Sequence, residues 1–240
     1  MKIDWGFVRE AFPEVIKYIP VTLQLTLITF LISFPLGVIL ALINHHNVKG
    51  LAKIVRVYIS LIRGTPVLLQ IYVVYNILPM ILTDFLKSIG SDFKVYSLSA
   101  KIFAYLALSI STTVTISEAV RSGLVTVNKG QREAAKAVGL NNIETFFHVV
   151  FPQAFAAAFP VIVNGFVDLI KVTSLAFLMT VVEITGKAQL LGGMELRYLE
   201  AYVTVAFVYI ILIVAVELIA KPVEKRLNVY RGGKVRNAAG

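Results

Sequence analysis

Charged and amide side chains stand inside a stretch of the sequence that is otherwise apolar, and their spacing is helical. Asn164, Asp168 and Lys171 occupy positions i, i+4 and i+7, so a helix would place all three on one face. Charges at membrane depth are costly, and an Asp and a Lys three residues apart can neutralise each other. Alternatively, the face could bind a zwitterion, because an amino acid carries an ammonium and a carboxylate that need partners of opposite sign. The residues alone leave both interpretations open.

A second polar series precedes the first by about fifty residues. Its members recur at i, i+4, i+7 and i+11 and again share one helical face: Ser111, Thr115, Glu118 and Ser122. Such a face is typical of a helix–helix interface with small hydroxyl residues, or of the wall of a water-filled pathway. Glu118 has a third option, because Arg121 lies three residues further on and can pair with it.

Arg63 stands directly before a break in another apolar run, Gly64-Thr65-Pro66. Unwound backbone at membrane depth is tolerated only where it is buried in protein or faces water. Arg63 could anchor this bend by donating to backbone carbonyls, or it could help to gate a pathway.

The elements that must position these residues are membrane-spanning helices. The chain has 240 residues, 58% of them apolar, and a mean hydropathy of +0.80. A helix crosses the hydrocarbon core with roughly 20 apolar residues. Five runs meet that requirement, over residues 18–43, 54–82, 98–125, 149–178 and 201–219. We therefore expect an all-α polytopic membrane protein, a single transmembrane domain over residues 1–240. The second run should consist of a short helix, a break and then the span.

The charge distribution gives an orientation. The net charge is +9, and Lys and Arg are more frequent in the loops after the first and third runs and in the C-terminal tail than on the opposite face. Excess positive charge marks cytoplasmic loops, so the N-terminus is expected outside and the C-terminus in the cytoplasm. The basic character therefore does not indicate nucleic acid. The absence of cysteine excludes disulfides and thiolate chemistry. Residues 183–200 are expected to form an external loop with a charged rim.

The loop over residues 126–148 has its own helical signals. A short helix with one apolar side should include Glu133, Ala134 and Ala135 and end at Gly139, because glycine readily takes the left-handed conformation of a helix end. Asn141 and Glu144 then fit a capping box at the start of the next helix. This amphipathic corner could lie on the lipid headgroups or dock onto a soluble cytoplasmic partner.

Four motifs in this chain resemble a known family. Glu133-Ala134-Ala135 with Gly139 and Phe151-Pro152-Gln153 is similar to the EAA signature of ABC importer permeases. Three further segments resemble the polar amino acid uptake branch in order and spacing: Ile62-Arg63-Gly64-Thr65-Pro66 with Gln70, Ser117-Glu118 with Arg121, and Ile170-Lys171-Val172-Thr173-Ser174-Leu175. The chain departs from the branch at Val172, where a polar residue is usual, and at Asn128, where proline is common.

The resemblance implies a type I ABC importer permease fold in the cell membrane of a prokaryote. It implies a second permease subunit, identical or closely related, two ATPase subunits that grip the coupling helices, and an extracytoplasmic protein that delivers substrate. ATP and Mg²⁺ would be bound by the ATPase, with no cofactor in this chain. The pathway residues would be Asn164, Asp168, Lys171, Ser111, Thr115, Glu118 and Arg63, and the coupling residues Glu133, Ala134, Ala135 and Gly139. Cystine- or glutamine-like substrates are favoured, with basic amino acids as the alternative.

Other classes of function fit the sequence less well. A secondary transporter often has internal repeats with paired broken helices, and no second copy of the Arg-Gly-Thr-Pro break is present. An enzyme would need a nucleophile or metal constellation, but HExxH and GxSxG are absent, as is the Walker A loop that holds phosphates. We therefore expect neither catalysis nor a metal site in this chain.

Overall fold

The computed structural model describes residues 3–230, and over that range its regular secondary structure is helical throughout, with no strand. The basic residues of the C-terminal tail that entered the charge comparison, Arg231, Lys234 and Arg236, lie outside the described residues. Five segments are long and apolar enough to cross a membrane: Ile19–His45, Val67–Ser88, Ala100–Thr126, Asn142–Met179 and Tyr198–Tyr230. The prediction of an all-α protein with five spans is confirmed.

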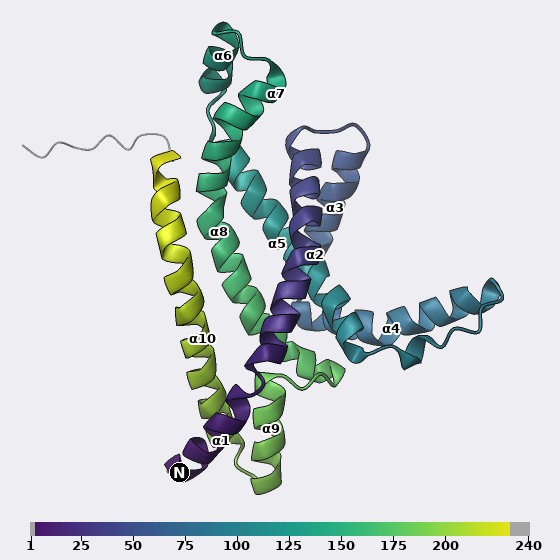
Figure 1. Ribbon diagram of the computed structural model, residues 1–240. Helices are drawn as coiled ribbons and strands as arrows, with labels where there is room; N and C mark the ends of the chain where they lie inside the picture. The colour runs from purple at the N-terminus through teal and green to yellow at the C-terminus, as the bar shows by residue number, and fades with distance from the viewer. Residues whose placement is uncertain (1–2, 231–240) are drawn as a thin grey trace, which may run out of the picture.

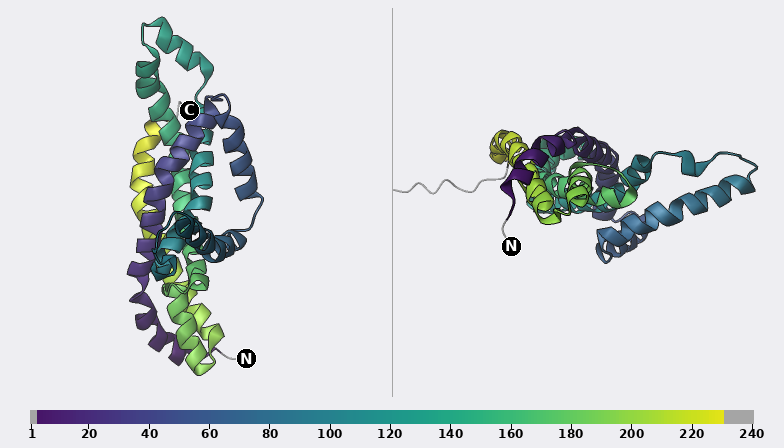
Figure 2. Two further views of the ribbon diagram at one scale, coloured as in Figure 1. Left: turned by 90° about the vertical axis from the view of Figure 1, so that its right-hand side faces the viewer. Right: turned by 90° about the horizontal axis from the view of Figure 1, so that it is seen from below.

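The central helix is α5 (Ala100–Thr126), which packs between α2 (Ile19–His45) and α8 (Phe151–Val172). Serine, threonine, alanine and glycine are frequent in α5, and these small side chains let both neighbours approach closely. The last long helix, α10 (Tyr198–Leu227), lies along α8 and extends eight residues beyond the predicted end of its span at residue 219. Figures 1 and 2 show this bundle in three orientations.

The second apolar run is divided as the sequence predicts. A short helix, α3 (Leu51–Arg63), lies against α2 and α5, and the Gly64-Thr65-Pro66 break follows it. The span α4 (Val67–Ser88) then leaves the bundle sideways, as Figure 1 and the right-hand view of Figure 2 show. The chain returns through a 3-10 turn, η1 (Val95–Ser97), to the start of α5. Most apolar side chains of α4 are therefore exposed in the single chain.

Two short helices lie at one end of the bundle, and two more lie at the other. At one end are α6 (Lys129–Ala137) and α7 (Asn142–Thr145), which joins α8 through a π-helical turn, η2 (Phe146–Val150). At the opposite end, α1 (Trp5–Ile16) packs on α10 and on α9 (Ile184–Glu195). A 3-10 helix, η3 (Thr173–Met179), leads from α8 towards α9, and another, η4 (Asn228–Tyr230), follows α10.

The expected external loop over residues 183–200 is wrong in part, because most of it is helix α9 and two of its acidic residues are buried. Glu183 has no exposed surface and Glu200 only 8%. Glu183 caps α9 by accepting a hydrogen bond from the Gly186 amide at 2.9 Å. Its other oxygen accepts from the Tyr209 hydroxyl at 3.0 Å and from Thr22 Oγ1 at 3.4 Å. Hydrogen bonds from Thr22 of α2 and Tyr209 of α10 thus allow Glu183 to be buried, whereas the sequence predicts that its side chain lies in solvent on the rim of a loop.

Candidate functional site

The polar face of α8 is not covered by any other part of residues 3–230. Asn164, Asp168 and Lys171 are all exposed, although they lie in the middle and last turns of a membrane-spanning helix. Lys171 Nζ donates to Asp168 Oδ1 at 2.9 Å, so the ion pair that the spacing allows is formed. The two side chains retain 54% and 68% of their exposure. A charged face of this kind is costly against lipid, so it requires either water or another protein surface.

The polar series on α5 lies beside that face. Thr115 is exposed, and it contacts Gly165 of α8, the residue that follows Asn164. The hydroxyls of this series bond to carbonyls of their own helix: Ser111 to Leu108, Thr115 to Ser111, and Ser122 to Ala119. Their backbone partners leave each hydroxyl oxygen able to accept a further hydrogen bond.

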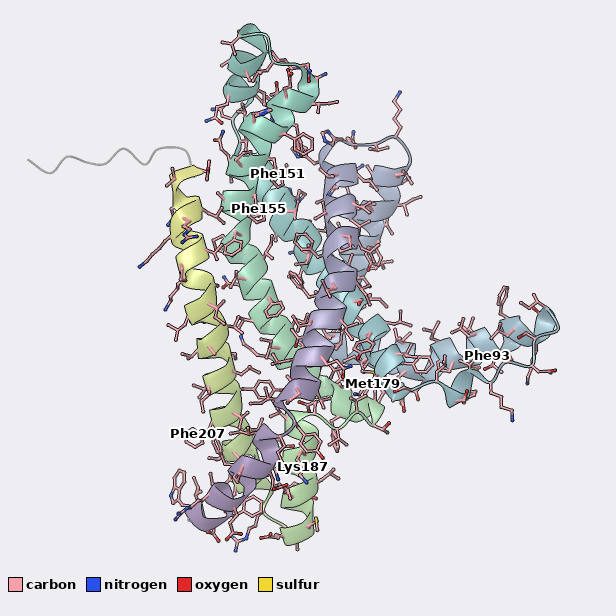
Figure 3. All side chains as sticks on the ribbon, viewed as in Figure 1. Phe93, Phe151, Phe155, Met179, Lys187 and Phe207 are labelled. Atoms are coloured by element: carbon pink, nitrogen blue, oxygen red, sulfur yellow. The ribbon has the colours of Figure 1, made fainter. Side chains whose placement is uncertain are left out.

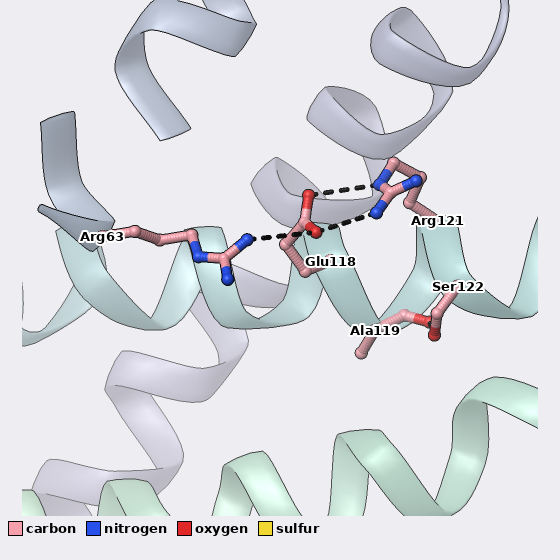
Figure 4. A network of polar contacts seen from close by, with 5 residues as sticks. All are labelled: Arg63, Glu118, Ala119, Arg121 and Ser122. Carbon is pink, nitrogen blue, oxygen red and sulfur yellow. Dashed lines mark hydrogen bonds and ion pairs between the residues drawn. The ribbon is translucent and has the colours of Figure 1, made fainter. Parts of the chain in front are cut away.

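Glu118 is bonded to two arginines from different helices (Figure 4). Arg121, one turn further along α5, donates from Nε at 3.2 Å and from Nη2 at 3.0 Å to the two carboxylate oxygens. Arg63, at the end of α3, brings Nη1 within 3.5 Å of Glu118 Oε2. The predicted pairing of Glu118 with Arg121 is therefore present. A cavity of about 540 Å³ opens beside these three residues, between the ends of α2, α3 and α5.

The bend after α3 is held by Gln70, a residue for which the sequence indicated no role of its own. Its side-chain amide donates to the Ile62 carbonyl at 2.9 Å, to the Thr65 carbonyl at 3.0 Å and to Thr65 Oγ1 at 3.1 Å. The expectation that Arg63 bonds these carbonyls is wrong, because its guanidinium reaches across to Glu118 instead. The position of Gln70, one helical turn beyond Pro66, indicated that its side chain lies near the bend. Spacing alone did not indicate which carbonyl groups it would bond.

The corner between α6 and α7 has the local structure that the sequence predicts. Gly139 adopts φ +94°, while its amide donates to the Lys136 carbonyl at 3.0 Å and the Leu140 amide to the Ala135 carbonyl at 3.2 Å. These two bonds form a Schellman motif. Both halves of the capping box between Asn141 and Glu144 are present. Ala135 is buried, whereas Glu133 and Ala134 are exposed.

The corner also has apolar side chains that remain exposed in the described part of the chain. Val138 is 79% exposed, Ile143 69% and Phe147 59%. Apolar groups clustered at such a tip are typical of an interaction surface. Across residues 3–230, no group of three or more His, Asp or Glu side chains is arranged to hold a metal ion.

A bundle of five hydrophobic helices with a structured loop beyond it defines a class, the polytopic membrane proteins, and a polar face at membrane depth is typical of those that transport solutes. The comparisons define the family. Residues 33–229 match the model described as "Binding-protein-dependent transport system inner membrane component". The chain belongs to this family of ABC transporter permeases, and it is a permease subunit rather than a secondary transporter.

Relatives and solved structures agree with this assignment. The chain is 34% identical to the L-cystine transport system permease protein TcyL of Bacillus subtilis (strain 168), over 94% of this chain and 92% of the relative. It is 32% identical to the probable amino-acid permease protein YxeN of the same organism, over 94% and 96%. A crystal structure of an amino acid ABC transporter with histidines superposes with a TM-score of 0.78 at 26% identity, covering 94% of this chain and all of that one.

Proposed function

We propose that this protein is the permease subunit of an ATP-driven importer of polar amino acids, cystine- or glutamine-like in preference to basic. The observation that carries the proposal is the uncovered polar face of α8, on a chain that belongs to the permease family. Support for the substrate class comes from relatives described as L-cystine permeases at 34% identity. A relative described as an arginine transport permease is 28% identical, which keeps basic amino acids as the alternative.

The pathway would run along α8 and α5. Asp168 would attract the substrate ammonium and Lys171 its carboxylate, while Asn164 and the hydroxyls of Ser111 and Thr115 offer neutral hydrogen bonds. Because Asp168 and Lys171 pair with each other at 2.9 Å, the ion pair keeps the face neutral when no substrate is bound. A zwitterion can exchange both halves of that pair for its own charges without leaving either unpaired.

A second permease subunit would pack against the exposed polar face of α8. The exposed face of α8 and the largely exposed helix α4 are two of the surfaces left open over residues 3–230. Two copies, or two closely related chains, would enclose the charged residues between them, which removes the cost of exposing them to lipid.

The corner formed by α6, Gly139 and α7 would seat in the ATPase subunit. ATP and Mg²⁺ would be bound there and not in this chain. Closure of the ATPases would move the corner together with η2 and α8, with which it is continuous. The pathway would then turn from inward-facing to outward-facing and receive substrate from an extracytoplasmic binding protein. The Arg63–Glu118–Arg121 network, which ties α3 to α5, would move with the same change. The N-terminus would lie outside and the C-terminus in the cytoplasm.

The test combines partner identification with transport. The protein is extracted from its native membrane in mild detergent, and co-purifying chains are identified by mass spectrometry. We expect a soluble ATPase with a Walker A motif in stoichiometric amount. Uptake of labelled cystine, glutamine and arginine is then compared in cells with and without this chain. Purification of this chain alone, including from nucleotide-trapped preparations, would overturn the importer; arginine uptake without cystine or glutamine uptake would overturn the substrate preference.

A further inference from the structure

A basic cavity lies at the end of α2, where α6 and α7 face it. Its volume is about 480 Å³, and its cationic or ionisable lining consists of His45, His46, Arg132 and Lys136. Arg132 Nη2 lies 3.4 Å from His45 Nε2, so the two residues meet although 87 positions separate them. Among residues 3–230, no Asp or Glu lines the cavity. Arg132 and Lys136 are positively charged, so an anion held between them would be stabilised, and the two imidazole rings can add N–H donors.

Two buried polar atoms in this lining lack a partner. Arg132 Nε is inaccessible to solvent and makes no hydrogen bond within the described part of the chain. Thr145, whose side chain lines the same cavity, is only 4% exposed, and its Oγ1 is also unpartnered. A buried donor without an acceptor costs roughly 1–3 kcal/mol. Because both atoms are closed off from solvent, a ligand in the cavity reaches them only after the Arg132 and Thr145 side chains turn towards it. Both can then donate to acceptor oxygens, such as those of a phosphate group.

An apolar groove continues directly from the basic cavity. Its volume is about 370 Å³, and its lining is entirely hydrophobic: Phe34, Val38, Leu42, Val120, Leu124, Phe146, Phe147, Phe151, Ala154, Phe155, Ala158 and Ile162. Leu124, Phe146 and Phe147 line both the groove and the basic cavity, which makes the two continuous. The groove lies between α2, α5 and α8, and together the cavity and the groove have a basic end and an apolar end.

The part of α8 that lines the groove is about as long as one leaflet of a membrane is deep. Phe151 and Phe155 follow each other along α8, stacked with ring centroids 5.8 Å apart (Figure 3). From Phe151 to Ile162 the helix rises by about 16 Å at roughly 1.5 Å per residue. Half of the hydrocarbon core is about 15 Å thick. A ligand that fills both parts thus needs an anionic head and an apolar tail about as long as one leaflet is deep.

We propose that the cavity and the groove form one binding site for an anionic glycerophospholipid of the cytoplasmic leaflet. The phosphate accepts from Arg132, Thr145 and the histidines, and one acyl chain lies in the groove beside Phe151 and Phe155. Basic pockets between transmembrane helices on the cytoplasmic side are known to suit anionic headgroups. A free phosphate would explain the basic end but would leave the apolar groove without an occupant. The assignment to the cytoplasmic leaflet rests on the proposed orientation, whereas binding itself does not require transport.

The site has a structural consequence for the coupling corner. A lipid held here contacts the end of α2 on one side and α6, α7 and η2 on the other. It therefore bridges the bundle and the corner that the proposed function assigns to the ATPase. The lipid composition of the membrane would then change how firmly the corner is held.

The test is native mass spectrometry of the detergent-purified permease with whatever partners it retains, mixed with phosphatidylglycerol, phosphatidylcholine or inorganic phosphate. The double variant His45→Gln/Arg132→Gln removes the basic end, and Val38→Trp fills the groove without changing charge. Lys49→Gln is the matched control, because it removes one exposed positive charge outside the cavity. We expect wild type and Lys49→Gln to bind phosphatidylglycerol at least tenfold more tightly than phosphatidylcholine. Both site variants should lose that preference.

Three outcomes would overturn the proposal. Equal retention of the two lipids by the wild-type protein would exclude an anionic site. Unchanged phosphatidylglycerol binding in both site variants would place any bound lipid elsewhere. Inorganic phosphate that displaces phosphatidylglycerol at equal concentration would assign the cavity to a cytosolic anion. Because none of these measurements uses uptake or ATP hydrolysis, a negative result leaves the importer proposal standing, and failure of the importer proposal leaves this one standing.

Discussion

Gly123 of α5 lies against the backbone of α8 at Ala154. A Cβ at position 123 would stand 2.3 Å from the Ala154 carbonyl oxygen, a distance that no real contact reaches. Further along the same interface the relationship is reversed, because a Cβ on Gly165 of α8 would stand 2.9 Å from Thr115 Cγ2 of α5. The two glycines allow α5 and α8 to pack closely. They therefore set the distance between the two polar series that would line the proposed pathway.

Gly123→Ala should destabilise the protein, because the Ala154 carbonyl belongs to a helix backbone and cannot move alone. Overpacking of this kind costs about 1–3 kcal/mol. Gly165→Ala should cost less, because a side-chain methyl can shift. Thr115→Ser removes that methyl and should restore the stability of Gly165→Ala while leaving Gly123→Ala unchanged. Thermal unfolding of the detergent-solubilised variants checks this, and equal melting temperatures for the two glycine variants would contradict it.

Gly139→Asp should leave the protein inserted in the membrane but abolish most ATP-driven uptake. At φ +94° an L-residue is strained by roughly 1–2 kcal/mol, and the new charge would lie at the proposed ATPase surface. Gly90→Asp is the matched control, since it adds the same charge at another glycine with positive φ and open space around it, in the loop after α4 and outside the corner, and it should leave uptake normal. Uptake and ATPase co-purification are compared with membrane abundance. Normal uptake by Gly139→Asp would refute the coupling role of the corner.

Asp168→Asn and Lys171→Gln should each reduce uptake severalfold with little change in stability. The pair is more than half exposed in the chain, and exposed ion pairs contribute only about 0–1 kcal/mol. Glu14→Gln breaks another exposed pair, with Lys17, outside the spans and should leave uptake normal. Transport assays and melting curves are measured on the same preparations. Loss of stability with unchanged uptake would show instead that the pair serves only the structure.

Glu183 should make stability depend on pH. Burial raises the pKa of its carboxyl above the ordinary value of 4.5, although hydrogen bonds from the Thr185 and Gly186 amides and from Tyr209 and Thr22 oppose the rise. Between 4.5 and the raised pKa the folded protein holds a proton that the unfolded chain releases. Stability therefore falls as pH rises through that interval.

The measurement is the melting temperature of the solubilised protein from about pH 5 to pH 8. Glu183→Gln should flatten the decline, because an amide keeps an acceptor for the Gly186 amide but does not titrate. Glu195→Gln serves as the control, since its side chain is 59% exposed. A decline of equal slope in Glu183→Gln and wild type would show that other groups cause the pH dependence.

The sequence by itself determined the features whose causes are local. Five apolar runs indicate five spans because hydrocarbon thickness fixes helix length. The corner at Gly139, the capping box of Asn141 and Glu144, and the pairs Glu118–Arg121 and Asp168–Lys171 involve residues within one or two helical turns. Backbone geometry alone brings such residues together, and for that reason spacing was sufficient.

Only the tertiary structure decided the contacts between residues far apart in the chain. It buried Glu183 against Thr22, 161 positions away, and Tyr209, which turned an expected external loop into helix α9. In the tertiary structure Gln70 holds the bend after α3, and Arg63 pairs with Glu118 instead. Arg132 meets His45 at one end of an apolar groove. These positions follow from how helices pack, and packing depends on the shapes of several surfaces at once, which no periodicity along one chain records.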